Sequence, residues 1–410
     1  MMGDKSMTYL DLPALDDVLD ISAQIIKDTS LDFTRYLLAS LHDAPRLTIL
    51  KGARGVGKTT LLLQLAKKMQ KAKKTVYLSL DHIFFSRHKL YYTITHLYKE
   101  GYTFFVLDEV HRYEDWSTEI KNIYDHFPQI TLLATSSSAL DLGKGMGDLS
   151  RRAVVYHLRG LSFREYLSFE HGLDLPVFTF DEVLKNHGDI YDSWYKSQNL
   201  GKKFQNYLVT GVYPYYRTTG KAYHQQILNT VSRVTDIDLP AIFNIDYSTT
   251  RQVKKLLAVM AGITPFTPNI SKLARDLEMN RSSVLTYLDY LDSASLIHVL
   301  RSGLKSDSAL AKPDKVLIEN TNLHHALCSG HTHTGSHRET YCVFAFNAAH
   351  HVSTPARGDL LIDQQYTIEI GGPGKSFHQI ANMPNPILIL DTKEKGNKDT
   401  IPMWMLGLFY

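Results

Sequence analysis

A glycine-rich segment at residues 52–59 constrains the fold more than any other feature of this 410-residue chain. It reads Gly-Ala-Arg-Gly-Val-Gly-Lys-Thr and lies between the apolar run LTILK (47–51) and the helix-forming run TLLLQLAKKMQ (60–70). Strand, glycine-rich loop and helix in this order are the context in which the pattern GxxxxGK[ST] forms a P-loop. Glycine tolerates the backbone angles that let successive amides curl around phosphate oxygens. The segment therefore predicts a phosphate-binding site.

The loop residues are the candidates for contact with ATP. We expect Lys58 to place a positive charge beside the β and γ phosphates and Thr59 to offer its hydroxyl to Mg²⁺. The first turn of the following helix adds a partial positive charge at the same place. The alternative is a glycine-rich turn that binds nothing. The candidates for the cofactor-binding role are Gly52, Ala53, Arg54, Gly55, Val56, Gly57, Lys58, Thr59 and Thr60.

A second acidic element follows at the end of the apolar run FFVLDE (104–109). Asp108 is the candidate ligand of Mg²⁺, since carboxylate oxygens suit this ion. Glu109 is the candidate for polarising the attacking water, because hydrolysis needs a carboxylate near the nucleophile. Such a pair is also typical of a solvated strand end, and the P-loop in the same chain is what favours the catalytic interpretation.

Two further groups are candidates for contact with the γ phosphate. The run ITLLATS (130–136) leads into four consecutive hydroxyl side chains, of which Ser136 is the candidate sensor. Arg152 follows a glycine-rich loop, and an arginine at such an edge stabilises transition-state charge within one chain or from a neighbouring subunit. The alternatives are an ordinary polar strand exit for Ser136 and a plain surface pair for Arg151 and Arg152.

Strand-like and helix-like patterns alternate in the first part of the chain. Apolar runs at 47–51, 75–80, 102–109 and 130–136 are separated by helix-forming stretches and preceded by two short amphipathic helices within 9–41. The alternation predicts an α/β fold with a parallel sheet and right-handed crossovers.

The remainder of the chain shows different patterns. Residues 269–300 have the rhythm of a helix-turn-helix followed by a wing strand. A His-rich loop at 324–337, a helix at about 338–349 and the strands LLID and YTIEI then indicate a mixed α/β region. We therefore expect a P-loop domain at 1–160, a helical lid and winged-helix region at 161–301, and a small mixed α/β domain at 302–410.

Composition restricts the class of protein. The chain has 45 Lys and Arg against 42 Asp and Glu, a formal charge of +3, which is too weak to indicate nucleic acid as a general partner. Its only two cysteines, Cys328 and Cys342, form no disulfide framework and fit a reducing compartment. The N-terminus lacks the apolar core of a signal peptide, and no run approaches the ~18 apolar residues of a membrane helix. We expect a cytoplasmic protein without a membrane partner.

At these residues the sequence resembles the prokaryotic predicted ATPases of the AAA+ superfamily, which carry an N-terminal AAA domain and a C-terminal domain of unknown function. The resemblance rests on GARGVGKTT, LDEVHRYEDW, TSSSAL and the passage from LSRR to LSFREYL. The later segments TGVYPYY and KPDKVLIENTNL are less specific matches. It implies an AAA-type ATPase that uses ATP and Mg²⁺. Arg152 matches the family arginine, although Arg151 stands where the family usually has glycine.

The C-terminal domain of that family resembles the PD-(D/E)XK nuclease fold, which implies a second candidate site. Its metal-binding positions correspond to Glu339 on a helix, Asp359 at one strand and Glu369 on the next. The nuclease pattern has a lysine two residues after Glu369, but this chain has Gly371, so Lys375 from the following loop is the candidate replacement. A degenerate, structural nuclease fold is favoured over a working nuclease.

Weaker signals leave the partners open. The winged-helix segment offers Asn280, Arg281 and Tyr287 to DNA, but so few cations predict weak phosphate binding, and docking of a protein partner fits equally well. The Cys328–Cys342 segment holds ligand types for zinc at no standard spacing, and a solvated loop is the favoured interpretation.

Three functions are consistent with these features. The first is an ATP-dependent switch or motor that couples the nucleotide state to the C-terminal domain, with a protein partner or a second copy of the chain as possible contacts. The second is a nuclease effector gated by ATP. The third is a non-catalytic scaffold gated by nucleotide. The absence of an NKxD motif favours adenine over guanine.

Overall fold

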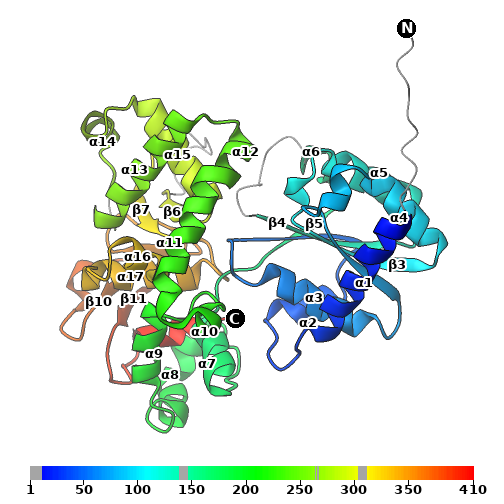
Figure 1. Cartoon of the computed structure of the whole chain (residues 1–410). Helices are drawn as coiled ribbons and strands as arrows, with labels where there is room; N and C mark the ends of the chain where they lie inside the picture. The colour runs from blue at the N-terminus through cyan, green and yellow to red at the C-terminus, as the bar shows by residue number, and fades with distance from the viewer. Residues whose placement is uncertain (1–11, 138–145, 264, 266, 303–311) are drawn as a thin grey trace. The chain divides into compact units, whose positions relative to one another are not determined.

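The computed structural model describes residues 12–137, 146–263, 265, 267–302 and 312–410 (Figure 1). Its internal contacts divide the chain into two compact units, Met1–Leu158 and Arg159–Tyr410. This division, between Leu158 and Arg159, lies close to the predicted domain boundary at residue 160. The second predicted boundary, at 301/302, lies inside the second unit, where a further division into two domains stays a prediction.

The first unit is built on a five-stranded parallel sheet in the order β2-β3-β4-β1-β5. The four predicted strands are confirmed. The sheet gains β5, which pairs with β1 and which the short run VVYH did not signal. The strands are β1 (Leu47–Gly52), β2 (Lys74–Ser79), β3 (Tyr102–Asp108), β4 (Thr131–Ser137) and β5 (Val154–His157).

Helices pack on this sheet because its strands are apolar on both faces. One set of alternate strand residues, including Leu47, Phe105 and Leu132, forms a buried core with α1, α4 and α5. The intervening residues face α3, which follows the glycine-rich loop. The helical elements of this unit, of which the first two precede β1, are α1 (Leu12–Asp28), α2 (Leu37–His42), α3 (Lys58–Met69), η1 (Ile83–Ser86), α4 (Leu90–Lys99), η2 (Val110–Arg112), α5 (Trp116–His126) and α6 (Met146–Leu149).

The second unit begins with helices, as predicted. Capping boxes start α7 at Ser162 and α8 at Thr179. The elements are α7 (Phe163–His171), α8 (Phe180–Trp194), α9 (Leu200–Val209), α10 (Tyr216–Thr219), η3 (Gly220–Ala222), α11 (Tyr223–Arg233), the π-helical segment η4 (Val234–Asp238), α12 (Leu239–Phe243) and α13 (Tyr247–Ile263).

The predicted winged-helix segment contains two helices followed by a strand pair. Asn269 caps α14 (Ile270–Asp276) and Asn280 caps α15 (Arg281–Ser293). The strands β6 (Ile297–Leu300) and β7 (Lys315–Ile318) pair antiparallel. This order of elements agrees with a winged helix, although membership in that class stays a prediction.

A second, mixed sheet closes the chain in the order β12-β11-β10-β9-β8, with antiparallel pairs at β8–β9 and β9–β10 and parallel pairs from β10 to β12. The predicted loop at 324–337 is shorter in the structure, because α16 runs to Leu327 and α17 begins at Thr334. The elements are α16 (Thr321–Leu327), α17 (Thr334–Phe346), β8 (Val352–Ser353), β9 (Leu360–Ile362), β10 (Tyr366–Gly371), η5 (Phe377–Gln379), β11 (Pro386–Leu390), β12 (Thr400–Pro402) and η6 (Met403–Leu408). In the part of the chain that the structure describes, no helix is long and apolar enough to cross a membrane.

Candidate nucleotide-binding site

The glycine-rich loop joins the end of β1 to the start of α3, as the sequence predicted. Gly55 and Gly57 have φ values of 85° and 95°, in the left-handed region that glycine adopts without strain. A Cβ atom on Gly52 would lie 2.2 Å from the carbonyl oxygen of Leu158, so this position has no room for a side chain. The glycines therefore let the backbone turn tightly enough to direct its amides toward one point.

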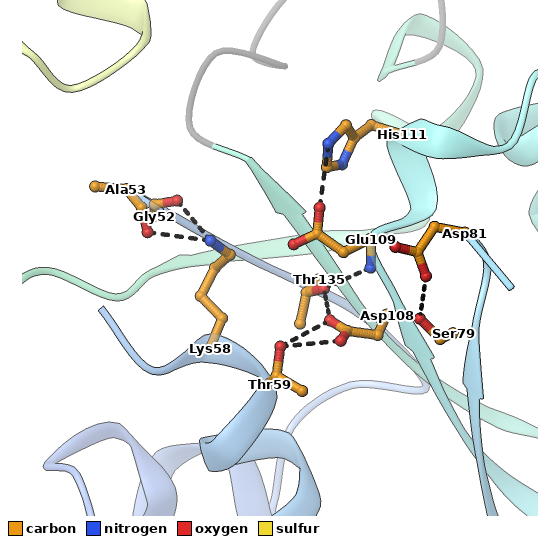
Figure 2. Close-up of polar contacts among 10 residues, drawn as sticks. All are labelled: Gly52, Ala53, Lys58, Thr59, Ser79, Asp81, Asp108, Glu109, His111 and Thr135. Carbon is orange, nitrogen blue, oxygen red and sulfur yellow. Dashed lines mark hydrogen bonds and ion pairs between the residues drawn. The ribbon is translucent and has the colours of Figure 1, made fainter. Parts of the chain in front are cut away.

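Lys58 points back into this loop (Figure 2). Its ammonium group donates to the carbonyl oxygens of Gly52, at 2.8 Å, and Ala53, at 3.1 Å, and the side chain is buried. Backbone oxygens are weaker partners for an ammonium group than charged phosphate oxygens. These contacts hold the ammonium group of Lys58 beside the loop. A phosphate bound there would compete with the carbonyl oxygens of Gly52 and Ala53 for this group.

The carboxylate of Asp108, at the end of β3, is held by hydroxyl groups. Thr59 Oγ1 donates to both of its oxygens, at 3.1 and 2.9 Å, and Tyr77 Oη donates to Oδ2 at 2.9 Å. Thr135 Oγ1 donates to Oδ1 in a very short contact. Burial, together with the adjacent negative charge of Asp108, raises the pKa of Tyr77, so that its phenol stays a donor. Asp108 is thus fixed beside Thr59.

The donor set at this point fits Mg²⁺. The ion prefers hard oxygen ligands and is commonly bound by one or two protein oxygens together with substrate phosphates. The hydroxyl of Thr59 and the carboxylate of Asp108 are such oxygens, they lie within 3.1 Å of each other, and both adjoin the loop that Lys58 enters. These two residues would hold the ion.

Glu109 occupies a strained backbone position immediately after Asp108. Its φ of 53° lies in the left-handed region, which is unfavourable for a residue with a side chain and is common at functional sites. Its amide donates to Thr135 Oγ1 at 2.9 Å, and one of its carboxylate oxygens lies 3.3 Å from Nε2 of the buried His111 (Figure 2). The backbone turn thus separates the Glu109 side chain from Asp108 and places it beside an imidazole.

The hydroxyl of β4 that contacts the acidic pair is that of Thr135, whereas Ser136 was the predicted sensor. Successive side chains of a strand point to opposite faces, so only one of the two is able to face α3 and Asp108. Ser136 is aligned with Lys51 of β1, and both lie on the other face of the sheet. Burial in that face lowers the pKa of Lys51 to about 8.

Arg152 lies in an ion pair. Its guanidinium donates from Nε and Nη2 to the two carboxylate oxygens of Asp125 on α5, at 2.8 and 2.9 Å. This bidentate contact lowers the pKa of Asp125. The structure therefore brings together Lys58, Thr59, Asp108 and Glu109, but joins Arg152 to a different group.

Two residues of this site were not predicted, and a third, Thr135, was one of four consecutive candidate hydroxyls. Tyr77 and Thr135 would have followed from strand periodicity, since both share the sheet face of Asp108. Arg35, just before α2, is buried and donates from Nη1 to the carbonyl oxygen of Val56 in the P-loop, at 2.6 Å. No local pattern signalled Arg35, because the contact joins segments that are distant in sequence.

The second candidate site is assembled in the C-terminal sheet. Glu339 comes from α17, Asp359 immediately precedes β9, and Glu369 lies on β10 and is buried. Lys375 reaches the cluster, since its Nζ lies 2.5 Å from Glu369 Oε1 in an ion pair. Lys375 thus contacts Glu369, and its role as the replacement for a nuclease lysine stays a prediction.

Lys315 of β7, which the sequence analysis missed, also enters this cluster. Its Nζ forms an ion pair with Glu339 and lies 4.0 Å from Asp359. Burial raises the pKa values of Glu339 and Glu369 above the ordinary value of a glutamate. The positive charges of the nearby lysines offset only part of this rise. Among the described residues, no group of three or more His, Cys, Asp or Glu side chains is arranged to hold a metal ion. Instead, the ammonium groups of Lys315 and Lys375 form ion pairs with the carboxylates of Glu339 and Glu369.

Comparisons with known proteins agree with the geometry of the first unit. Residues 44–167 match a family model described as an AAA domain, and residues 201–333 match one described as a domain of unknown function, DUF8612. The chain is 27% identical over 290 residues to the uncharacterized protein MJ1637 of Methanocaldococcus jannaschii, in a match that covers 67% of this chain and 61% of that protein. The matched part thus spans less than two thirds of the length of that relative.

Solved structures with similarity to the chain include two of named proteins. PCH-2 of C. elegans is 20% identical, with 46% of this chain and 48% of that chain covered, at a TM-score of 0.25. AMPPCP-bound DnaA from Aquifex aeolicus is 16% identical, with 66% and 87% covered, at a TM-score of 0.25. On the family matches, the chain carries an AAA domain, characteristic of ATP-binding ATPases, followed by a domain of unknown function.

Proposed function

We propose that this protein is a magnesium-dependent ATPase whose nucleotide state controls the unit formed by residues 159–410. The observation that carries the proposal is the junction of Thr59 and Asp108 beside the loop that holds the Lys58 ammonium group. A cation-binding oxygen pair next to a nest of backbone amides is the arrangement that a nucleoside triphosphate requires.

The residues of the site would act in a defined order. Lys58 exchanges the carbonyl oxygens of Gly52 and Ala53 for the β and γ phosphates. Bound Mg²⁺ would supply charge neutralisation on the phosphate oxygens. Glu109 accepts a proton from the attacking water, while Thr135 fixes the backbone of Glu109 and the carboxylate of Asp108 together. Loss of the γ phosphate removes its contacts, and this difference would drive a conformational switch.

Phosphate release from ATP tests this function. We expect Lys58→Ala to abolish nucleotide binding, and Glu109→Gln to retain binding while losing hydrolysis by at least about 100-fold, the usual size of a general-base contribution. Lys68→Ala is the matched control, because Lys68 lies on the same helix, exposed and away from the loop. Hydrolysis by the Glu109 variant at the rate of the original protein would remove Glu109 from the mechanism.

Coupling to the second unit is tested by hydrogen exchange. We expect amides within residues 159–410 to differ in protection between the ATP-bound Glu109→Gln variant and the same protein with ADP. Identical exchange in both states would leave an ATPase without a switch.

A second candidate function rests on the cluster in the C-terminal sheet. The candidate is an ATP-gated nuclease, since carboxylates and a lysine are the groups that polarise a phosphodiester, and here Asp359 lies near Lys315 while Glu369 pairs with Lys375. Metal-dependent cleavage of DNA that disappears in Glu369→Ala, with ATP hydrolysis unchanged, would support it. Absence of cleavage with every divalent metal would favour the degenerate form of the fold and a scaffold function.

A further inference from the structure

A cavity in the second unit has an aromatic floor and a polar rim. It measures about 370 Å³ and is lined by the end of α8, by α9, by the segment after β11 and by η6. Its aromatic and apolar lining residues Tyr195, Phe204, Met403 and Trp404 are buried. The lining also includes the acidic residues Asp391, which is paired with Arg338, and Glu394. This volume lies within the range of small-molecule sites, which combine apolar walls with a few polar groups.

One polar group in this floor lacks a partner. The indole Nε1 of Trp404 is buried without a hydrogen-bond partner among the residues that the structure describes. A buried N–H without an acceptor costs free energy, so such groups normally find one. Trp404 lines the cavity, but the nitrogen itself is enclosed by protein atoms, so a ligand acceptor would reach it only after a movement of the side chains around it.

The aromatic floor is held rigidly in place. The ring of Tyr195 lies 5.6 Å from that of Trp404 and is stacked on Tyr191 at 4.5 Å. Tyr191 Oη also donates to the carbonyl oxygen of Lys393 at 2.6 Å, which ties the loop after β11 to α8. A Cβ atom on Gly201 would lie 2.5 Å from Tyr195 Oη, so the glycine makes room for this ring. The cavity is therefore formed before any ligand arrives.

A second cavity of about 510 Å³ adjoins the first, sharing Tyr195, Gly201, Gln205 and Lys393 with it. Its lining includes three exposed lysines, Lys196, Lys202 and Lys393. In the described ranges of the chain, the ammonium groups of these lysines form no ion pair, whereas the nearby Lys395 is paired with Asp192. Unpaired lysines beside a cavity are suited to bind phosphate.

We propose that these joined cavities bind an unpaired nucleotide, with its base against Tyr195 and Trp404 and its phosphate on the three lysines. Aromatic side chains accept any base through stacking, and the lysines supply positive charge for its phosphate. The site lies wholly within the second unit and is distinct from the P-loop. The same chemistry fits a free nucleotide or one residue of a single-stranded nucleic acid.

The test uses the full chain with Lys58→Ala, so that the P-loop does not contribute binding. The probes are AMP, followed by titration calorimetry, and a fluorescein-labelled oligothymidylate, followed by anisotropy at low salt. We expect at least one probe to bind. AMP binding identifies a free nucleotide, and binding of the oligonucleotide alone identifies a strand.

Substitutions then locate the bound probe. We expect the pair Lys196→Gln and Lys393→Gln to weaken binding about tenfold, and each lost phosphate contact to reduce the salt dependence on a single strand by about 0.7 in log–log slope. Trp404→Phe, which keeps an aromatic ring but has a smaller stacking surface, should weaken binding several-fold. Lys395→Gln is the control and should leave affinity unchanged.

Two results would overturn the proposal: failure of both probes to bind, or an equal loss of affinity in the Lys395 control and the lysine pair. Neither result bears on the ATPase, which is measured separately in the chain that retains Lys58.

Discussion

The hydroxyl of Thr59 is hydrogen-bonded to both carboxylate oxygens of Asp108, although the two residues lie on different elements, at the start of α3 and the end of β3. This contact joins the phosphate-binding loop to the acidic edge of the sheet. It means that the cation-binding oxygens are aligned by the fold itself, with Tyr77 and Thr135 holding the carboxylate from β2 and β4.

Asp108→Asn should separate nucleotide binding from its magnesium dependence. Three hydroxyl groups donate hydrogen bonds to the carboxylate oxygens of Asp108. In the asparagine variant one of these oxygens becomes an NH₂ group, which is itself a donor and cannot accept the hydrogen bond of the hydroxyl beside it. We expect the variant to bind ATP without the increase in affinity that Mg²⁺ gives the original protein, and to lose hydrolysis by at least about 100-fold. ATP titrations with and without Mg²⁺ measure this.

The control for that experiment is Asp81→Asn. Asp81 follows the neighbouring strand and accepts a hydrogen bond from Ser79 at 2.6 Å, but is exposed (Figure 2). We expect it to keep the magnesium effect. If both variants lost the effect equally, the assignment of the cation to Asp108 would be wrong.

Thr135→Val tests which hydroxyl of β4 serves the site. The substitution keeps the shape of the side chain but removes the contacts to Asp108 and to the amide of Glu109. We expect kcat to fall by about 10- to 100-fold, a loss of roughly 1.4–2.7 kcal/mol in transition-state stabilisation, with a smaller change in KM.

Ser136→Ala is the matched control for this position, since the neighbouring side chain faces away from Asp108. Steady-state kinetics of both variants decide between them. A larger loss of kcat in Ser136→Ala than in Thr135→Val would restore the sensor role to Ser136.

Much of the first unit was predictable because its signals are local. The apolar strands, the glycine-rich loop and the acidic end of β3 each lie within a few consecutive residues, and their order dictates a parallel sheet. The contact of Thr135, rather than Ser136, with Asp108 was not predicted, because residue type does not reveal which face of a strand a side chain occupies. Strand periodicity relative to Asp108 would have shown it.

The contacts that could not be predicted join distant segments. Arg35 reaches Val56, Arg152 pairs with Asp125, and Lys315 enters the cluster of Glu339. None of these pairs has a fixed spacing, because the tertiary fold alone determines them. In the second unit, Lys375 was identified only as a lysine able to reach Glu369, and its position required the structure.

Glu319→Gln should change how stability depends on pH. Burial raises the pKa of Glu319 from 4.5 to about 7, partly offset by Asn320 and Arg159. Between these values the folded chain retains a proton that the unfolded chain has lost, so stability falls as pH rises through this window. The glutamine stays neutral, and we expect its advantage over glutamate to grow from little at about pH 5 to on the order of 3 kcal/mol at about pH 8.

Urea unfolding followed by tryptophan fluorescence measures this difference. With Trp116 replaced by Phe in both proteins, the remaining tryptophans, Trp194 and Trp404, report on the second unit alone. The neighbouring His298, whose pKa burial lowers to about 3, also changes stability below about pH 6.5, but it is present in both proteins and its contribution cancels from the difference between them. An equal pH dependence in both proteins would mean that Glu319 is ionised in the folded chain.

Gly52→Ala should destabilise the first unit. The added Cβ would lie 2.2 Å from the carbonyl oxygen of Leu158, which is backbone and unable to rotate away, so β1 and the chain after β5 must separate. We expect a loss of more than about 3 kcal/mol in the free energy of unfolding, in the range of severe steric substitutions, and weaker ATP binding because the same residue begins the loop.

Gly188→Ala is the control. It lies within α8, and a Cβ atom added there would have no atom within 4 Å, so alanine should stabilise that helix by about 0.5–1 kcal/mol. Urea unfolding measures both changes, followed at Trp116 for the first unit in Gly52→Ala and at Trp194 and Trp404 for the second unit in Gly188→Ala. Unchanged stability in Gly52→Ala would mean that the approach of Leu158 to the P-loop does not exist in solution.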